Sequence, residues 1–229
     1  MDASDNTPVS RQKVIVLLSG GVDSVTALYL ALKEYNVVCA LSFNYGAKHN
    51  ARELECARYH ASLKGIRHEI ISLDFMDRLF KSDLLQSGAE IPKGRYTQEN
   101  MKSTVVPFRN GIMLSIAGGL ADSLEATGII IAAHSGDHSL YPDCRPAFMH
   151  AMNRAIQAGT GEAVSILSPF LNLNKGEIVR LGTSLGVDYA RTWSCYCGQE
   201  LHCGKCGTCV ERREAFVQAG VCDPTKYSL

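Results

Sequence analysis

The chain has 229 residues, 46% of them hydrophobic and 20% charged, which suits a globular enzyme with one core and an appendage, or two small domains. Lysine plus arginine and aspartate plus glutamate number 23 each, so no overall basic field exists to attract nucleic acid. Residues 1–12 lack the apolar core of a signal peptide or anchor, and no apolar run could span a bilayer, so we expect a disordered lead-in, a cytoplasmic protein and no membrane partner.

The first predicted elements enclose a loop of small residues. The aliphatic run 14–18 predicts a strand buried on both faces, and the apolar stretch 23–34 predicts a helix. The turn between them reads Ser19-Gly20-Gly21-Val22-Asp23-Ser24. Such a turn points free backbone N–H groups and the positive helix end at an anion, and its glycines let the backbone approach phosphate. The serine hydroxyls can donate to phosphate, and the aspartate can hold a magnesium ion.

This loop fits neither of two common nucleotide-binding patterns. No Gly-Lys-Ser/Thr follows it, and it is not Gly-x-Gly-x-x-Gly. The alternative is an ordinary turn capped by Asp23 or Ser24. The loop resembles that of the ATP pyrophosphatase superfamily, which cleaves ATP between the α and β phosphates. The ATP-binding residues implied by this resemblance are Leu18, Ser19, Gly20, Gly21, Val22, Asp23, Ser24, Val25, Thr26, Ala27 and Leu28.

Strands and helices alternate through the rest of the chain. Further strands are predicted at residues 37–43, 68–73, 128–133 and 164–167, and further helices at 50–64, 109–124, 146–158 and 175–185. This alternation predicts an α/β fold with a Rossmann-like parallel sheet, helices on both faces and ligands at the carboxyl ends of the strands. Residues 74–104 form a long excursion, typical of a lid, a binding loop or a disordered segment. We expect an α/β domain over 13–188 and a zinc-binding appendage over 189–229.

Polar residues at the predicted element ends are candidates for chemistry. Arg109 could clamp phosphate with two hydrogen bonds, or form a surface salt bridge. Lys175 could be a second cation on the phosphates, or a solvated lysine in the first helical turn. His134 and His138 follow a predicted strand, where they could transfer protons or serve as hydrogen-bonded structural histidines. The candidate catalytic residues are therefore Asp23, Ser24, Arg109 and Lys175.

Five of the nine cysteines fall within residues 195–209, which indicates a metal site, not disulfides, in a chain without a secretory signal. Four of them offer thiolates at the spacing of a zinc knuckle: Cys195, Cys203, Cys206 and Cys209. Zinc is favoured, and an iron–sulfur cluster is the alternative. Cys197 and His202 compete as ligands, although adjacent positions of an extended segment alternate in direction. A zinc-dependent nucleobase deaminase is excluded, because its His-x-Glu and Pro-Cys-x-x-Cys patterns are missing.

Together these motifs resemble the 7-cyano-7-deazaguanine synthase family of queuosine-precursor biosynthesis. The matching segments are residues 18–28, 43–46, 106–111, 141–146 and 192–196, with the cysteines beyond. The resemblance implies a carbon–nitrogen ligase that converts 7-carboxy-7-deazaguanine and ammonia to 7-cyano-7-deazaguanine (preQ0) with ATP, Mg²⁺ and one structural Zn²⁺ per chain. It favours Cys195 over Cys197 as a zinc ligand, and it implies a homodimer. We expect free ammonia as the nitrogen source and no nucleic-acid partner.

Recognition of a 7-deazaguanine calls for an acidic residue, because the base presents a ring N–H beside an exocyclic amine. Asp137 and Asp143, in the polar loop after the predicted strand 128–133, are the candidates, with a preference for Asp137. Asp143 could instead cap the following helix or pair with Arg145. Arg145 is a further candidate for substrate contact.

Two other functions are alternatives. Another enzyme of the same superfamily could modify tRNA or pass an activated deazapurine to a protein amine. The neutral charge and the lack of a recognisable RNA-binding domain disfavour tRNA modification. A zinc-knuckle protein that binds nucleic acid without catalysis would leave residues 19–24 unexplained.

Overall fold

The computed structural model describes residues 11–95, 101–137 and 141–228, with only the backbone of Asp137. Residues 1–10 of the expected lead-in, and the candidate His138, lie outside the described residues.

Five parallel strands form one sheet in the order β3-β2-β1-β4-β5. The strands are β1 (Lys13–Leu17), β2 (Asn36–Asn44), β3 (His68–Ser72), β4 (Gly128–Ile130) and β5 (Ser165–Leu167). From β1 the chain builds outward to β3, and it then returns to the other side of β1 for β4 and β5. The connections therefore diverge beside β1 and β4, where α/β sheets bind their ligands. The predicted parallel α/β fold is confirmed.

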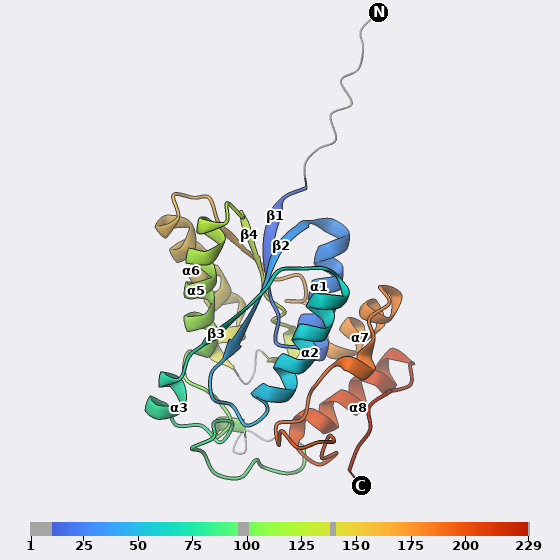
Figure 1. Ribbon diagram of the computed structural model, residues 1–229. Coiled ribbons are helices and arrows are strands. Elements are labelled where there is room, and N and C mark those ends of the chain that lie inside the picture. Colours follow the sequence, from blue (N-terminus) through green and yellow to red (C-terminus); the bar gives the residue numbers. More distant parts are fainter. Residues whose placement is uncertain (1–10, 96–100, 138–140, 229) are drawn as a thin grey trace, which may run out of the picture.

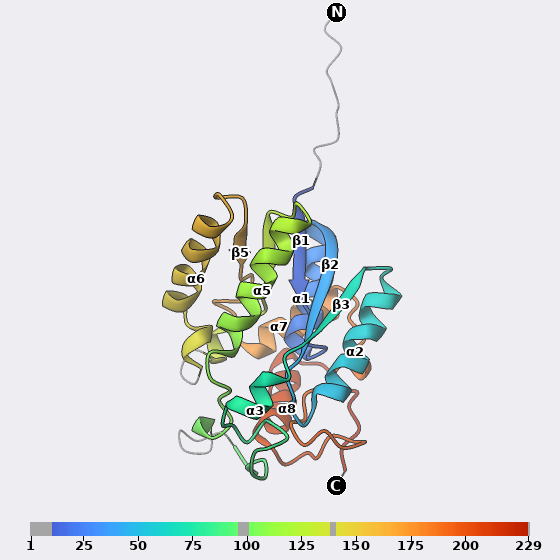
Figure 2. The same ribbon diagram turned by 60° about the vertical axis from the view of Figure 1, so that its left-hand side comes forward.

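Helices cover both faces of this sheet (Figures 1 and 2). One face carries α1 (Val22–Glu34), α2 (Asn50–Leu63) and α7 (Lys175–Ser184). The opposite face carries α5 (Arg109–Ser123) and α6 (Pro146–Gly159). The C-terminal helix α8 (Gly207–Ala219) lies beside α7, below the sheet in Figure 1.

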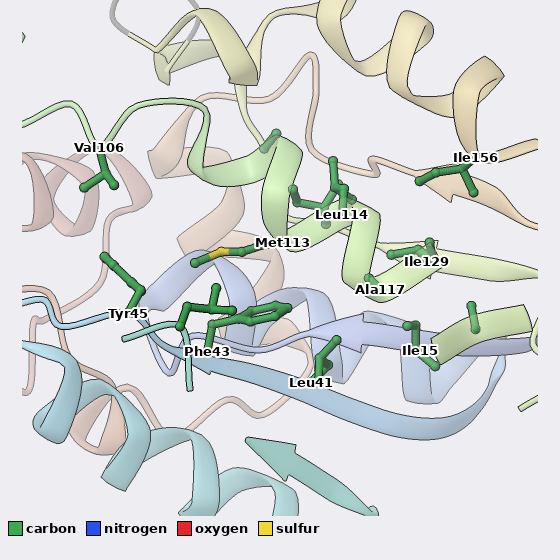
Figure 3. Packing of buried hydrophobic residues seen from close by; sticks show 14 of the residues in the cluster. Ile15, Leu41, Phe43, Tyr45, Val106, Met113, Leu114, Ala117, Ile129 and Ile156 are labelled. Carbon is green, nitrogen blue, oxygen red and sulfur yellow. The ribbon is translucent and has the colours of Figure 1, made fainter. Parts of the chain in front are cut away.

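Two hydrophobic cores form because successive strand side chains point to opposite faces. Val14 and Val16 of β1 pack with Leu28 of α1, whereas Ile15 between them packs with Leu114 of α5. Figure 3 shows this second core, with Ile15 on the strand and Leu114 on the overlying helix. The central strand β1 is therefore held from both sides, and the loop at its carboxyl end rests on a well-packed base.

The long excursion contains structure that the sequence pattern did not predict. A short helix, α3 (Phe75–Leu79), follows β3, and Leu84 and Leu85 are buried. The ammonium group of Lys48 donates to four carbonyl oxygens at 2.5–3.1 Å, those of Asp83, Leu85, Gly88 and Ala89. The described part of the excursion is thus tied to the domain by one half-buried lysine.

The remaining differences lie at β4 and α8. The predicted strand 128–133 ends at Ile130, where its ladders with both neighbours, β1 and β5, stop. Helix α8 was not predicted, since its buried face includes Thr208, Cys209 and Arg212, which break the apolar pattern of a buried helix.

Candidate active site

A cavity lies at the carboxyl ends of β1, β2 and β4, between the starts of α1 and α5. One end is lined by Ser19, Asp23 and Ser24, which belong to the phosphate loop (residues 19–24). The middle is apolar, with Phe43 and Met113 among the lining residues. A polar phosphate end joined to an apolar chamber suits a nucleotide with a second flat ligand.

The phosphate loop is organised by the hydroxyl of Ser24. Its Oγ accepts hydrogen bonds from the backbone N–H groups of Ser19 and Gly20 at 3.1 and 3.2 Å. The same oxygen donates to the carbonyl of Gly21 at 3.2 Å. Gly21 is the N-cap of α1 and makes no side-chain cap, so the helix start stays open toward the cavity. This is the geometry by which a helix N-terminus binds an anion.

The two glycines of the loop differ in their surroundings. Gly20 has a φ of +93°, and a Cβ there would overlap the backbone carbonyl of Glu53 in α2. A Cβ at Gly21 would meet nothing nearer than 3.4 Å, at the hydroxyl of Ser19. Packing against α2 therefore requires glycine at position 20, whereas the closeness of phosphate to position 21 stays a prediction.

Four ionisable side chains gather at the phosphate end. The Nζ of Lys175 lies 3.4 Å from Oδ2 of Asp23 and 2.7 Å from Oε2 of Glu211. The Nε2 of His134 lies 3.8 Å from the same Asp23 oxygen. The other oxygen of Asp23, Oδ1, is buried without a hydrogen-bond partner. An orphaned carboxylate oxygen beside an anion site fits a hard cation such as Mg²⁺, which prefers oxygen ligands.

Local structure explains how these residues meet. Lys175 opens α7 immediately after Asn174, whose side chain caps the helix together with Glu177. Glu211 was missed by sequence reasoning, because it lies on the unpredicted helix α8. The only signal in the sequence was its closeness to Cys209, since a metal site fixes the segment that follows it.

Arg109 lies in the same cavity, at the wall formed by the start of α5. Its guanidinium donates to the hydroxyl of Tyr45 at 3.3 Å and lies 5.7 Å from the centre of that ring. No carboxylate of the described residues forms an ion pair with it. Arg109 is thus a cation that faces the cavity, as a role in binding an anionic ligand requires.

Two further ionisable groups, His49 and Glu53, line the cavity near this wall. Sequence reasoning assigned neither of them a role; their i,i+4 spacing at the start of α2 was the available signal. Burial lowers the pKa of His49 to about 3, so this imidazole is neutral at pH 7. Burial also raises the pKa of the Glu53 carboxyl to about 8, against the opposing charge of Arg109.

The predicted substrate contacts are arranged differently from the phosphate contacts. Asp143 accepts a hydrogen bond from the backbone N–H of Asn110 at 2.8 Å, so its carboxylate caps the start of α5 and not the helix after it. Arg145 is exposed at the start of α6. Neither of these two residues lines the cavity. The side chain of Asp137 lies outside the described residues.

The candidate metal centre lies beside the cavity. The sulfur atoms of its four cysteines all lie within 4.8 Å of one another: Cys195, Cys203, Cys206 and Cys209. The Sγ atoms of Cys203 and Cys209 are 4.0 Å apart, near the roughly 3.8 Å that tetrahedral Zn–S bonds of about 2.3 Å would produce. The four thiols can therefore hold a metal such as zinc.

The two competing residues are outside this group of sulfurs. Cys197 is not part of the cluster. The Nε2 of His202 accepts a hydrogen bond from the backbone of Ser194 at 3.0 Å, and the His202 ring lies 4.1 Å from the ring of Trp193. His202 thus supports the segment that carries the first cysteine.

Within the described ranges, no helix combines the length and the apolar character needed to cross a membrane.

Comparison with known proteins gives close sequence relatives. Residues 13–220 match the model of the family described as "Queuosine biosynthesis protein QueC". The chain is 56% identical to a 7-cyano-7-deazaguanine synthase of Porphyromonas gingivalis, over 93% of this chain and 96% of the relative. It is 52% identical to that of Desulfotalea psychrophila, with 93% and 97% covered, and 44% identical to that of Methanoregula boonei, with 94% and 99% covered.

Solved structures resemble the fold at low identity. The NMN synthetase of Francisella tularensis aligns with a TM-score of 0.52 at 16% identity, over 93% of this chain and 79% of that chain. The U34-tRNA thiolase NcsA of Methanococcus maripaludis aligns with a TM-score of 0.52 at 17% identity, over 81% of this chain and 61% of that chain. These two matches support the architecture of the sheet and helices.

Proposed function

Because the chain belongs to the QueC family, we propose that it is a carbon–nitrogen ligase that converts 7-carboxy-7-deazaguanine and ammonia to 7-cyano-7-deazaguanine (preQ0) with ATP. The observation that carries this proposal is the open phosphate loop at the end of β1, with Lys175 beside it and an apolar chamber behind it. One end suits a triphosphate, and the other suits a flat heterocycle.

The chemistry explains why such a site is needed. A carboxylate is a poor electrophile, because its charge repels nucleophiles and oxide cannot leave. Transfer of AMP to the carboxylate gives a mixed anhydride, from which ammonia displaces AMP to form the amide. Loss of water from the amide to form the nitrile requires its oxygen to be activated as well, and a second adenylation would do this. Both adenylations release pyrophosphate, whose developing charge must be stabilised.

The residues of the phosphate end support that task. Ser24 holds the loop so that its N–H groups and the start of α1 face the pyrophosphate. Lys175 supplies a positive charge, and Glu211 and Asp23 hold its ammonium group in position. The unpartnered Asp23 oxygen would hold Mg²⁺, which supplies charge neutralisation to the phosphates when bound. Arg109 would contact an anionic group of either ligand.

The cysteine cluster has a structural role in this proposal. Four thiolates make a closed shell without an open position for substrate, as in structural zinc sites. Cys195 follows Trp193, whose backbone N–H donates to the carbonyl of Gly20 at 3.0 Å. The metal would therefore steady the segment that supports the phosphate loop.

Several finer points are also proposals. We propose a homodimer in the cytoplasm, as the family resemblance implies, and free ammonia as the nitrogen source. We also keep the division into residues 13–188 and 189–229, with the second part packed on the first. Asp137, Asp143 and Arg145 remain proposed substrate contacts, and the geometry of Asp143 supports a role in holding the start of α5.

The proposed function is tested by product analysis. The purified protein is incubated with ATP, an ammonium salt and 7-carboxy-7-deazaguanine, and the products are separated by mass spectrometry. We expect the nitrile and AMP, with the amide as an intermediate. A reaction that stops at the amide, or that needs a tRNA or protein acceptor, would contradict the proposal.

A further inference from the structure

The ring N–H and the exocyclic amine of a 7-deazaguanine need a hydrogen-bond acceptor that is not already paired with another group of the protein. Three carboxyl groups line the cavity among the described residues: Asp23, Glu53 and Glu211. Asp23 and Glu211 both face the ammonium group of Lys175 at the phosphate end. Glu53 is therefore the lining carboxyl that lies away from this cation.

In the described part of the chain, the carboxyl group of Glu53 has no ion-pair partner that is charged at pH 7. The side chain is 16% exposed, and its Oε2 lies 3.7 Å from Nε2 of His49, which is beyond hydrogen-bond distance. The imidazole is neutral at pH 7, as described above, so it adds no positive charge. Arg109, which also lines the cavity, acts on this carboxyl through its charge without forming an ion pair with it, and its guanidinium is hydrogen-bonded to Tyr45.

We propose that the carboxylate of Glu53 recognises the guanine edge of the substrate, accepting hydrogen bonds from the ring N–H and from the exocyclic amine. This inference rests on the proposed function, because it takes a 7-deazaguanine as the ligand. Glu53 is a binding and specificity-determining residue here, and it takes no part in the transfer of AMP.

The carboxyl group of Glu53 and the guanine edge of the base are chemically complementary. A half-buried carboxyl that lacks donors holds its proton, in agreement with the raised pKa of about 8 for Glu53. Two N–H donors from the base supply what the carboxylate lacks, so the group binds this edge in its ionised form. Phe43 and Tyr45 also line the cavity, and their rings suit contact with a flat heterocycle.

In its ionised form, Glu53 does not suit the adenine of ATP as a partner. Adenine presents a ring acceptor beside its amine, and a carboxylate facing that edge would set two acceptors against each other. A protonated Glu53 could bind adenine, which makes the two ligands distinguishable by experiment.

The test measures binding by calorimetry with 7-carboxy-7-deazaguanine, with its analogue that lacks the exocyclic amine, and with a non-hydrolysable ATP analogue. Glu53→Gln replaces one acceptor by a donor, and it should weaken substrate binding by about 10- to 100-fold while changing ATP-analogue affinity less than about twofold. Glu55→Gln is the matched control, because Glu55 lies on the same helix with a side chain that is 66% exposed. It should leave all three affinities unchanged.

The ratio of the affinities for the substrate and for the analogue without the amine tests direct recognition. If Glu53 were only structural, its substitution would leave this ratio unchanged. The wild-type protein should bind the analogue without the amine about tenfold more weakly than the substrate, whereas Glu53→Gln should bind both about equally. If Glu53→Gln does not fold, Glu53→Asp keeps the charge at a shorter reach and should lose part of the selectivity. Thermal unfolding monitored by circular dichroism identifies the folded variants.

Several outcomes would overturn the inference. They are unchanged selectivity in folded Glu53→Gln, a selective loss of ATP-analogue affinity, loss of selectivity in Asp137→Asn alone, or a wild-type protein that binds no 7-deazaguanine. Binding requires no turnover, so this experiment is separate from the product assay. A protein that shows the selective loss but forms no nitrile would contradict the proposed reaction and leave the role of Glu53 intact.

Discussion

At the scale of single residues, the candidate site shows an unequal use of its carboxyl groups. Asp23 directs one oxygen toward Lys175 and His134 and keeps the other buried without a partner. Among the described residues, the only basic group within ion-pair distance of Glu53 is the His49 ring. This ring is neutral at pH 7, so Glu53 has no cation beside it. Residues that serve only the fold rarely leave a buried oxygen unpaired, so the arrangement of Asp23 points to a ligand. Glu53 points to a ligand because its carboxyl lines the cavity without a partner that is charged at pH 7 in the described part of the chain.

Asp23→Ala should lower the rate of AMP formation at least about 100-fold, because it removes both the cation ligand and the negative partner of Lys175. The free energy of unfolding should change by less than about 1 kcal/mol, since the side chain lies at a loop–helix junction and not in a core. The exposed Asp122→Ala in α5 is the control. A folded Asp23→Ala protein that forms AMP at the wild-type rate would refute this role.

Glu53 should also make stability depend on pH. Its folded-state pKa of about 8 lies above the ordinary value of 4.5, so the folded protein binds more protons between these values. The contribution of Glu53 is therefore present at low pH and is lost as pH rises toward 8 and beyond. Relative to Glu53→Gln, the wild type should lose about 1–3 kcal/mol of unfolding free energy between pH 5 and pH 9. Chemical denaturation at both pH values measures this, and parallel pH profiles for the two proteins would contradict it.

At the scale of elements, α8 connects three parts of the molecule. Cys209 at its start belongs to the metal cluster, Glu211 faces Lys175, and Phe216 packs in the core with α1 and α7. Arg212 is fully buried between them and donates to Thr192, Ser194 and the carbonyl of Tyr189, with a further ion pair to Asp223. Because its buried face makes polar and metal-site contacts as well as apolar ones, α8 lacks a continuous apolar stripe.

The metal ligands are separable by substitution. Replacing any one ligand by serine should abolish zinc binding and lower the yield of folded protein, because metal binding contributes to folding. The four variants are Cys195→Ser, Cys203→Ser, Cys206→Ser and Cys209→Ser. Cys197→Ser should keep one zinc per chain, since its sulfur is outside the cluster. Elemental analysis of the purified variants distinguishes the two cases. Zinc kept in Cys195→Ser and lost in Cys197→Ser would show that the ligand set is wrong at this position.

The sequence predicted the elements whose burial and conformation follow from their own residue types. The aliphatic run of β1 and the glycines after it identify a buried strand and an anion-binding loop. The roles of Glu53 and Glu211 could not be predicted, because the role of a carboxyl group depends on its partners in distant segments. For Glu211 that partner is Lys175. The extent of β4 likewise depends on its pairing with two neighbours, β1 and β5, from other parts of the chain.

At the scale of the whole molecule, the metal centre and the phosphate loop are joined through residues 193–195. The backbone of Trp193 donates to Gly20, and its indole N–H donates to the carbonyl of Cys195 at 2.7 Å. The C-terminal part is therefore built into the active site.

Removal of the metal by a chelator should accordingly weaken ATP binding as well as lower the melting temperature. We expect a loss of ATP affinity of about tenfold, because part of the loop's ordering would have to come from the ligand. Calorimetric titration with an ATP analogue before and after chelation, with zinc restored as the control, measures this. Unchanged affinity in the folded, metal-free protein would show that the two sites are independent.

The hydrogen bond from Asn110 to Asp143 crosses 33 residues of sequence, and it ties the loop before α6 to the first turn of α5, where Arg109 begins the helix. The position of the loop and that of the first turn of α5 are therefore linked, and we expect a substitution in the loop to affect the arginine that faces the cavity. Asp143→Asn should therefore disturb the start of α5 as well as any substrate contact that Asp143 itself makes. Loss of activity in this variant would therefore not by itself identify Asp143 as a substrate ligand, because the same hydrogen bond also holds the helix that carries Arg109.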